Sequence, residues 1–239
     1  MAARQRTVYP NNRLLLEAPE WFQTSVAGWM DGSPRYAAFI ELHRDKIRKK
    51  IRGLRDDEGL RDLACELLVA WRLLADRRCT LAYEPLLAGK TRGPDFALTF
   101  KGHLAVNVEV KRLRASVTAA RLADAVCDKL GQLPPGAPNA LVVCASMVEA
   151  SANGGNHSFE LGAALAALRA AAERSDPALF ARHGYRAPAD FFRGFLRLSA
   201  VRLRVPWEAD APETASALWG NPQARHPLPA ALQTALGVL

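Results

Sequence analysis

The stretch PDFALTFKGHLAVNVEVKR, residues 94–112, contains two strand-like segments separated by a lysine and a glycine. Apolar and polar residues alternate along the second segment, so its side chains are expected to fall on two faces. The valines share one face, and the polar residues on the opposite face are Asn107, Glu109 and Lys111. A Lys-Gly pair between two such segments is typical of a short hairpin connection. The pattern predicts two antiparallel strands with Glu109 and Lys111 on the same side.

Helical and strand-like segments surround this hairpin. Ser33 and Pro34 are typical first residues of a helix, here one that spans residues 33–52. The other expected helices cover about 57–76, 117–132 and 158–174, and the other expected strands cover 79–85, 140–146 and 195–205. This order predicts one α/β domain with a mixed central sheet flanked by helices. We expect the core at 57–205, after an N-terminal segment with a basic helix (1–56) and before a Pro- and Trp-containing segment (206–239) that packs on it.

The composition is that of a globular protein with enough apolar residues for a full core. The chain has 239 residues, of which 49% are hydrophobic, and its 32 Lys and Arg against 24 Asp and Glu give a net charge of +8. A basic protein of this size is compatible with a polyanionic partner. No apolar run approaches the roughly 20 residues needed to span a bilayer, and the first residues do not resemble a signal peptide. We therefore expect a soluble, cytoplasmic protein with no membrane partner.

The cysteines and histidines lack the spacing of zinc ligands. The five histidines include no H-E-x-x-H motif, and the four cysteines include no C-x-x-C pair. We expect buried free thiols at all four cysteine positions, Cys65, Cys79, Cys127 and Cys144.

Two carboxylates are expected to meet at the start of the hairpin. Asp95 opens the first strand behind Gly93 and Pro94, and the hairpin brings that strand alongside Glu109. Two converging carboxylates repel each other unless they share a cation. The alternative is ordinary turn chemistry for Asp95 and a solvent-facing strand for Glu109 and Lys111.

A third carboxylate lies on the helix that precedes the hairpin. Glu66 falls within the apolar stripe of the 57–76 helix, between Leu63 and Ala70. A carboxylate at such a position is costly unless it is paired or binds a metal. The alternatives for Glu66 are an ion pair with a nearby arginine and a position at the edge of the stripe. Lys111 would add the positive charge that a phosphate or a developing oxyanion requires.

Together these residues resemble the PD-(D/E)XK nuclease superfamily. Pro94-Asp95, thirteen intervening residues and then Glu109-Val110-Lys111 match its signature, with Glu66 upstream. The resemblance covers about residues 57–146 and implies a restriction-endonuclease-like core.

The resemblance also implies a metal-dependent nuclease that uses magnesium, or alternatively manganese. Asp95, Glu109 and the Val110 carbonyl would be metal ligands, and Glu66 an outer or second-metal ligand. Lys111 would assist the attacking water. Gln132 would lie beside the site, although it is equally typical of a helix end. Hydrolysis of a phosphodiester requires a nucleophile made from water and neutralisation of charge at the leaving oxygen. Magnesium held by carboxylates supplies both.

Basic residues gather in two places that would suit a nucleic-acid backbone. One set lies in the predicted 33–52 helix and the other around the hairpin: Arg48, Lys49, Lys50 and Arg52, then Lys90, Arg92, Arg112 and Arg114. Contacts from such residues to phosphates give affinity without sequence reading. The alternative for the first set is a solvated helix face.

These features leave two functional hypotheses. The first is a nuclease that acts on DNA in preference to RNA, with a homodimer as an open possibility for cutting both strands. The second is a catalytically silent module of the same fold that binds nucleic acid or protein.

Overall fold

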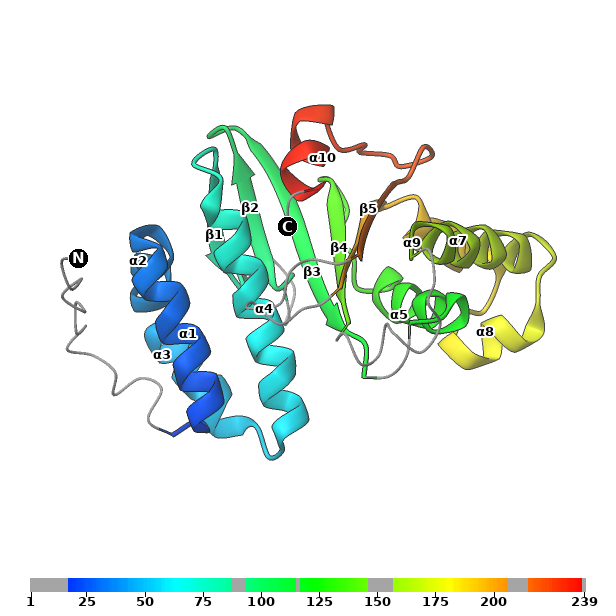
Figure 1. The fold of residues 1–239 in the computed structure, drawn as a ribbon. Helices are drawn as coiled ribbons and strands as arrows, with labels where there is room; N and C mark the ends of the chain where they lie inside the picture. Colours follow the sequence, from blue (N-terminus) through cyan, green and yellow to red (C-terminus); the bar gives the residue numbers. More distant parts are fainter. Residues whose placement is uncertain (1–16, 87–92, 115–116, 146–156, 206–214, 238–239) are drawn as a thin grey trace.

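A computed structural model describes residues 17–86, 93–114, 117–145, 157–205 and 215–237. Within them the chain forms one six-stranded mixed sheet with helices on both faces (Figure 1). The strands follow one another across the sheet in chain order: β1 (Cys79–Tyr83), β2 (Phe96–Phe100), β3 (Leu104–Arg112), β4 (Asn139–Cys144), β5 (Leu198–Val205) and β6 (Ala215–Gly220). The predicted α/β class and mixed central sheet are confirmed.

The predicted hairpin is present at β2 and β3. These strands pair antiparallel, with Phe96 opposite Val108 and Phe100 opposite Leu104. Three residues connect the strands, and two of them, Lys101 and Gly102, have positive φ angles. β1 also runs antiparallel to β2, whereas β3, β4 and β5 are parallel to one another and β6 returns antiparallel to β5.

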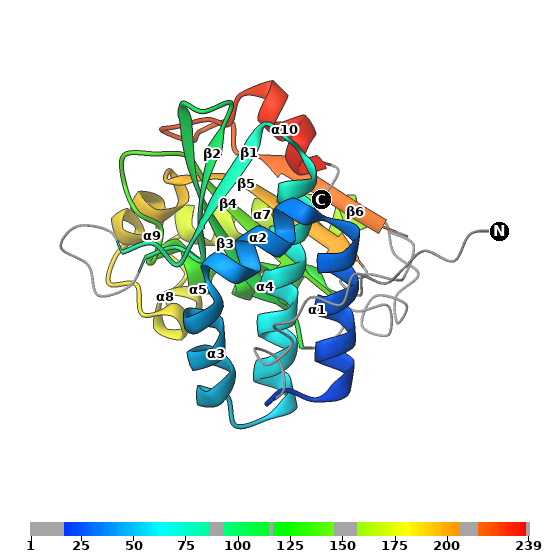
Figure 2. The ribbon, with the colours of Figure 1, turned by 90° about the vertical axis from the view of Figure 1, so that its left-hand side faces the viewer.

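Two hydrophobic cores lie on opposite faces of the sheet. The first is formed mainly by α1 (Glu20–Gly32), α2 (Pro34–Leu42), α3 (Arg44–Gly53), α4 (Asp57–Ala75) and α10 (Ala230–Gly237). Figure 2 shows α1, α2, α3 and α4 in front of the sheet. The second core involves α5 (Ala119–Leu130), α7 (His157–Glu173), α8 (Pro177–His183) and α9 (Pro188–Phe195). The valines of β3 belong to the first core, which confirms the predicted two-faced strand.

Several elements differ from the expectations. The predicted 33–52 helix is capped by Ser33 as expected, but it breaks at His43 into α2 and α3. The His43 ring packs 4.8 Å from the Phe39 ring and 5.9 Å from the Tyr83 ring. The break therefore directs the basic α3 helix towards the end of β1. The helices α1, α8, α9 and α10 and the strand β6 were not expected, and α9 occupies the start of the predicted 195–205 strand.

Two further expectations concern burial and membranes. All four cysteines are buried free thiols, as predicted. No helix among the described residues is both long enough and apolar enough to cross a bilayer.

Candidate functional site

The hairpin register places Asp95 directly beside β3. Asp95 precedes β2, and its Oδ2 accepts a hydrogen bond of 2.8 Å from the Val110 backbone N–H. Glu109 is the preceding residue of β3, and both carboxylates are almost completely buried, with exposed fractions of 6% and 4%. The two residues that the sequence singled out are thus brought together in the interior.

Gly93 makes this placement possible. A Cβ atom at Gly93 would lie 1.7 Å from the Pro85 carbonyl oxygen, so only glycine permits the two chain segments to approach this closely. One residue before Pro85, the Glu84 N–H donates a 2.8 Å hydrogen bond to the Asp95 carbonyl. The exit of β1 and the entry to β2 are therefore joined at Asp95.

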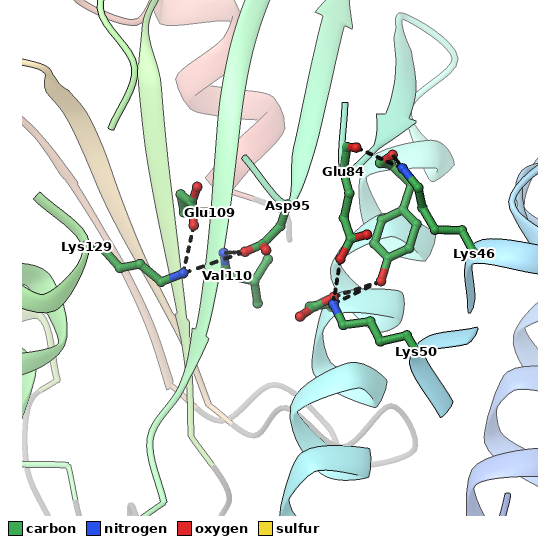
Figure 3. Close-up of polar contacts among 9 residues, drawn as sticks. Lys46, Lys50, Glu84, Asp95, Glu109, Val110 and Lys129 are labelled. Carbon is green, nitrogen blue, oxygen red and sulfur yellow. Dashed lines mark hydrogen bonds and ion pairs between the residues drawn. The ribbon is translucent and has the colours of Figure 1, made fainter. Parts of the chain in front are cut away.

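A buried lysine that the sequence analysis missed completes this cluster. Lys129 Nζ, from the last turn of α5, lies 2.7 Å from Glu109 Oε2 and 4.0 Å from Asp95 Oδ2. Figure 3 shows its side chain reaching towards both carboxylates. We call Asp95, Glu109 and Lys129 the Lys129 group. The signal that could have found Lys129 is its spacing, three residues after Val126 and seven after Leu122, both buried residues of α5.

A cavity of about 490 Å³ lies next to the Lys129 group. It runs between α4 and α5 over the end of β3. Lys129 both lines the cavity and contacts the buried carboxylates, which do not line it themselves. Its lining residues include Glu66, Val110, Lys111, Asp128, Lys129 and Gln132.

Lys111 and Gln132 lie at this cavity rather than within the Lys129 group. Lys111 Nζ is 3.7 Å from Asp128 Oδ2, and its side chain is 39% exposed. Gln132 Nε2 donates to the Asp128 carbonyl at 2.9 Å, which is helix-end bonding. Both side chains are thus placed to meet a molecule that enters the cavity.

The Val110 backbone is oriented towards Asp95. The N–H and C=O of one strand residue point to the same neighbouring strand. Because the Val110 N–H donates to Asp95, the Val110 carbonyl also faces that edge of β3. The Val110 carbonyl therefore lies on the same side of the strand as Asp95, and its role as a ligand stays a prediction.

Glu66 belongs to a second charged cluster. Its Oε2 accepts from Lys50 Nζ at 2.7 Å and from the Tyr83 hydroxyl at 3.1 Å. Lys50 Nζ also donates to Glu84 Oε1 at 2.9 Å and to the Tyr83 hydroxyl at 3.1 Å. We call these four residues the Lys50 group. It connects α3 and α4 to the end of β1, and Figure 3 draws it beside the Lys129 group.

The electrostatics of the Lys50 group link it to Asp95. Burial raises the pKa of Glu66 to about 7, Lys50 opposes the rise, and the nearby Asp95 charge adds to it. Burial alone would lower the pKa of Lys50, but Glu66 and Glu84 outweigh it and the net pKa is raised. Lys50 therefore stays charged, whereas Glu66 can exchange a proton near neutral pH.

The residues predicted to contact nucleic acid have varied surroundings. Arg52 makes a two-point ion pair with Glu17, and Lys50 lies in the group named above. Arg112 is buried and, like Arg114, pairs with Glu58 and Asp62 of α4. Lys49 is exposed, and Arg48 lies 3.8 Å from Asp45. Lys90 and Arg92 are outside the described residues. Phosphate contact by this set stays a prediction.

The donor chemistry of the Lys129 group fits a hard divalent cation. In the described part of the chain, no three His, Cys, Asp or Glu side chains form a metal-binding group by themselves. Magnesium, however, is commonly held by one or two carboxylates, with waters and substrate phosphates completing its coordination. Asp95 and Glu109 converge on one positive charge, the Lys129 ammonium, so the position between them already accommodates a cation.

Fold and site together define an α/β protein with a buried acid–lysine cluster beside a cavity at the end of its central strands. No protein-family model matches this chain, and no curated protein or solved structure matches it either.

Proposed function

We propose that this protein is a metal-dependent phosphodiesterase, a nuclease of the PD-(D/E)XK type that acts on DNA in preference to RNA. The single observation that carries the proposal is the convergence of Asp95 and Glu109 beside a cavity large enough for a nucleotide. The order α4, β1, β2, β3, α5, β4 supports the proposal, because the resemblance implies a helix, hairpin strands, a helix and a buried strand in that order.

In this proposal Asp95, Glu109 and the Val110 carbonyl hold magnesium, with manganese as a substitute. The bound metal would supply an activated water and neutralise charge at the leaving oxygen. Glu66 lies in the cavity wall and would act as an outer ligand once it leaves Lys50. Lys111 would orient the water or bind the scissile phosphate from the cavity.

Basic side chains around the cavity would hold the phosphate backbone. Arg112, Arg114 and Arg121 line it together with Lys111. The acids of α4 already pair with Arg112 and Arg114, so these two would serve mainly to orient the backbone. Use of both strands of a duplex would favour a homodimer.

A second function is favoured by the position of Lys129. Its ammonium offsets one of the two negative charges, so the protein has less need of a metal to balance the charge of Asp95 and Glu109. The alternative is a catalytically silent module that binds nucleic acid or protein through the same surface.

The test is incubation of the purified protein with plasmid and single-stranded DNA in magnesium, manganese or EDTA. Asp95→Asn serves as the inactive control, and circular dichroism checks its folding. Metal-dependent cutting that the variant lacks would support the nuclease. Salt-sensitive DNA binding with no cutting under any condition would favour the silent module.

A further inference from the structure

A buried ammonium lies beside the two carboxylates of the Lys129 group. Lys129 is the only buried lysine in the described ranges, with 8% of its surface exposed. Buried charges are tolerated when they are paired, and loss of one partner leaves an uncompensated charge. The ammonium therefore reduces the repulsion between the two carboxylates.

The ammonium lies where a cation bound by the same oxygens would lie. Lys129 Nζ is 2.7 Å from Glu109 Oε2 and 4.0 Å from Asp95 Oδ2. A magnesium ion requires carboxylate oxygens at about 2.1 Å, so it would share this space. A divalent cation and an ammonium repel each other strongly at such separations in a protein interior.

We propose that Lys129 is a built-in competitor for the metal site: its ammonium occupies the cation position and is displaced into the cavity when a divalent metal binds. This inference rests on the proposed metal site and adds to it a condition for metal entry. The single close contact of Lys129 favours release, because an ammonium has three donors and, among the residues that the structure describes, one oxygen lies within hydrogen-bond distance of Nζ.

The cavity offers the displaced side chain a destination. Lys129 already lines the cavity, and the carboxylate of Asp128 lines it one residue earlier on α5. A lysine side chain has a flexible four-carbon stem, so the ammonium can move while the helix stays fixed. In the displaced position it would face a phosphate bound in the cavity.

Lys111 supplies a matched control. It also lines the cavity and carries one positive charge, but it pairs with Asp128 at 3.7 Å rather than with the buried carboxylates. Lys111→Met therefore removes one positive charge and keeps a side chain of similar length, as Lys129→Met does. It leaves the ammonium beside Asp95 and Glu109 in place.

The first experiment measures manganese affinity by calorimetry for the wild type, Lys129→Met and Lys111→Met at one pH and salt concentration. We expect Lys129→Met to bind manganese about tenfold or more tightly than wild type, and Lys111→Met to stay within about threefold of it. Equal affinity of wild type and Lys129→Met would overturn the competition while leaving the metal site in place.

The remaining outcomes separate this inference from the proposed function. Binding by Lys129→Met but not by wild type would support the inference and overturn the metal-dependent nuclease. Absence of binding in both would overturn both.

A second measurement uses the wild type alone, in case Lys129→Met does not fold. An amine-reactive acetylating reagent is applied in EDTA and in manganese, and peptides are quantified by mass spectrometry. We expect acetylation of Lys129 to rise severalfold with manganese while that of Lys111 changes little. No rise at Lys129 would overturn the proposal.

Discussion

The Lys50 group and the Lys129 group each contain one lysine and two carboxylates but differ in how many close partners the lysine has. Each sets one lysine against two carboxylates (Figure 3). Lys50 has three partners, at 2.7, 2.9 and 3.1 Å, which matches the three donors of an ammonium. Lys129 has one partner at 2.7 Å and a second carboxylate at 4.0 Å. All three donors of the Lys50 ammonium are therefore used, whereas the Lys129 ammonium has one close partner and can exchange it more readily for another.

The location of each group agrees with this difference. The Lys50 group joins α3 and α4 to the end of β1, where Lys46 also donates to the carbonyls of Tyr83 and Glu84. It therefore anchors the N-terminal helices on the sheet. The Lys129 group is built from the residue before β2, from β3 and from α5, beside the cavity. Similar residues thus provide mainly a structural tie at one place, where Glu66 alone also lines the cavity, and a candidate reactive site at the other.

The largest expected effect separates the two groups by activity. Glu109→Gln keeps the size of the side chain but removes its charge, so metal-dependent cleavage should fall on the order of a thousandfold or more. Cleavage rates on plasmid DNA in magnesium measure this. Glu84→Gln in the Lys50 group is the matched control and should retain most of the activity. Similar losses in both variants would show that the groups act as one site.

The next prediction concerns the close approach of Gly93 to Pro85, which joins the end of β1 to Asp95. Gly93→Ala places a Cβ atom 1.7 Å from the Pro85 carbonyl oxygen. The segment that follows β1 must therefore move away from the segment that leads into β2. We expect a loss of about 3 kcal/mol in the free energy of unfolding, measured with urea, because backbone cannot yield as a side chain can. Gly131→Ala is the control, since nothing lies within 4 Å of a Cβ there and its φ of −68° suits alanine. A neutral Gly93→Ala would mean that Asp95 does not depend on this contact.

The hairpin and its acids were predictable because local signals determine them. The alternation around Val108, the Lys101-Gly102 turn and the proline before Asp95 all act over a few residues. Together they specify the register that brings Asp95 to the Val110 N–H. The convergence of Asp95 and Glu109 follows from that register, and so the sequence predicted it correctly.

Lys129 and the environment of Lys50 were not predictable in the same way. A lysine near a helix end usually lies in solvent, and only its place in the apolar stripe of α5 marked Lys129 as different. Lys50 belongs to a run of basic residues that is typical of a solvated face. Its contacts with Glu66 and Glu84 depend on the break at His43, and no local residue pattern predicted that break.

The pH dependence of the free energy of unfolding tests the raised pKa of Glu66 in the Lys50 group. The pKa of Glu66 is about 7 in the folded protein against an ordinary value of 4.5, so the folded state binds the proton more tightly. Wild type should therefore gain stability relative to Glu66→Gln as the pH falls from 8 to 4.5, by up to about 3 kcal/mol. Urea unfolding in EDTA across this range provides the measurement.

Glu17 provides a control for which the expected change in stability with pH has the opposite sign. Glu17 is exposed, and its hydrogen bond with Arg52 lowers its pKa below 4.5. Wild type should lose stability relative to Glu17→Gln as the pH falls through that lowered pKa. A wild-type curve parallel to that of Glu66→Gln would show that the Glu66 carboxyl titrates normally.

The smallest expected effect distinguishes two adjacent lysines. Lys49 is exposed, whereas the Lys50 ammonium has three partners. Lys49→Ala should reduce the slope of log DNA affinity against log salt by about 1 if it contacts a phosphate. Its stability should change by less than about 0.5 kcal/mol. Lys50→Met should instead cost about 2 kcal/mol of stability and leave the slope unchanged. A reduced slope in Lys50→Met would mean that this ammonium leaves Glu66 for a phosphate, and the contrast with Lys129 would then fail.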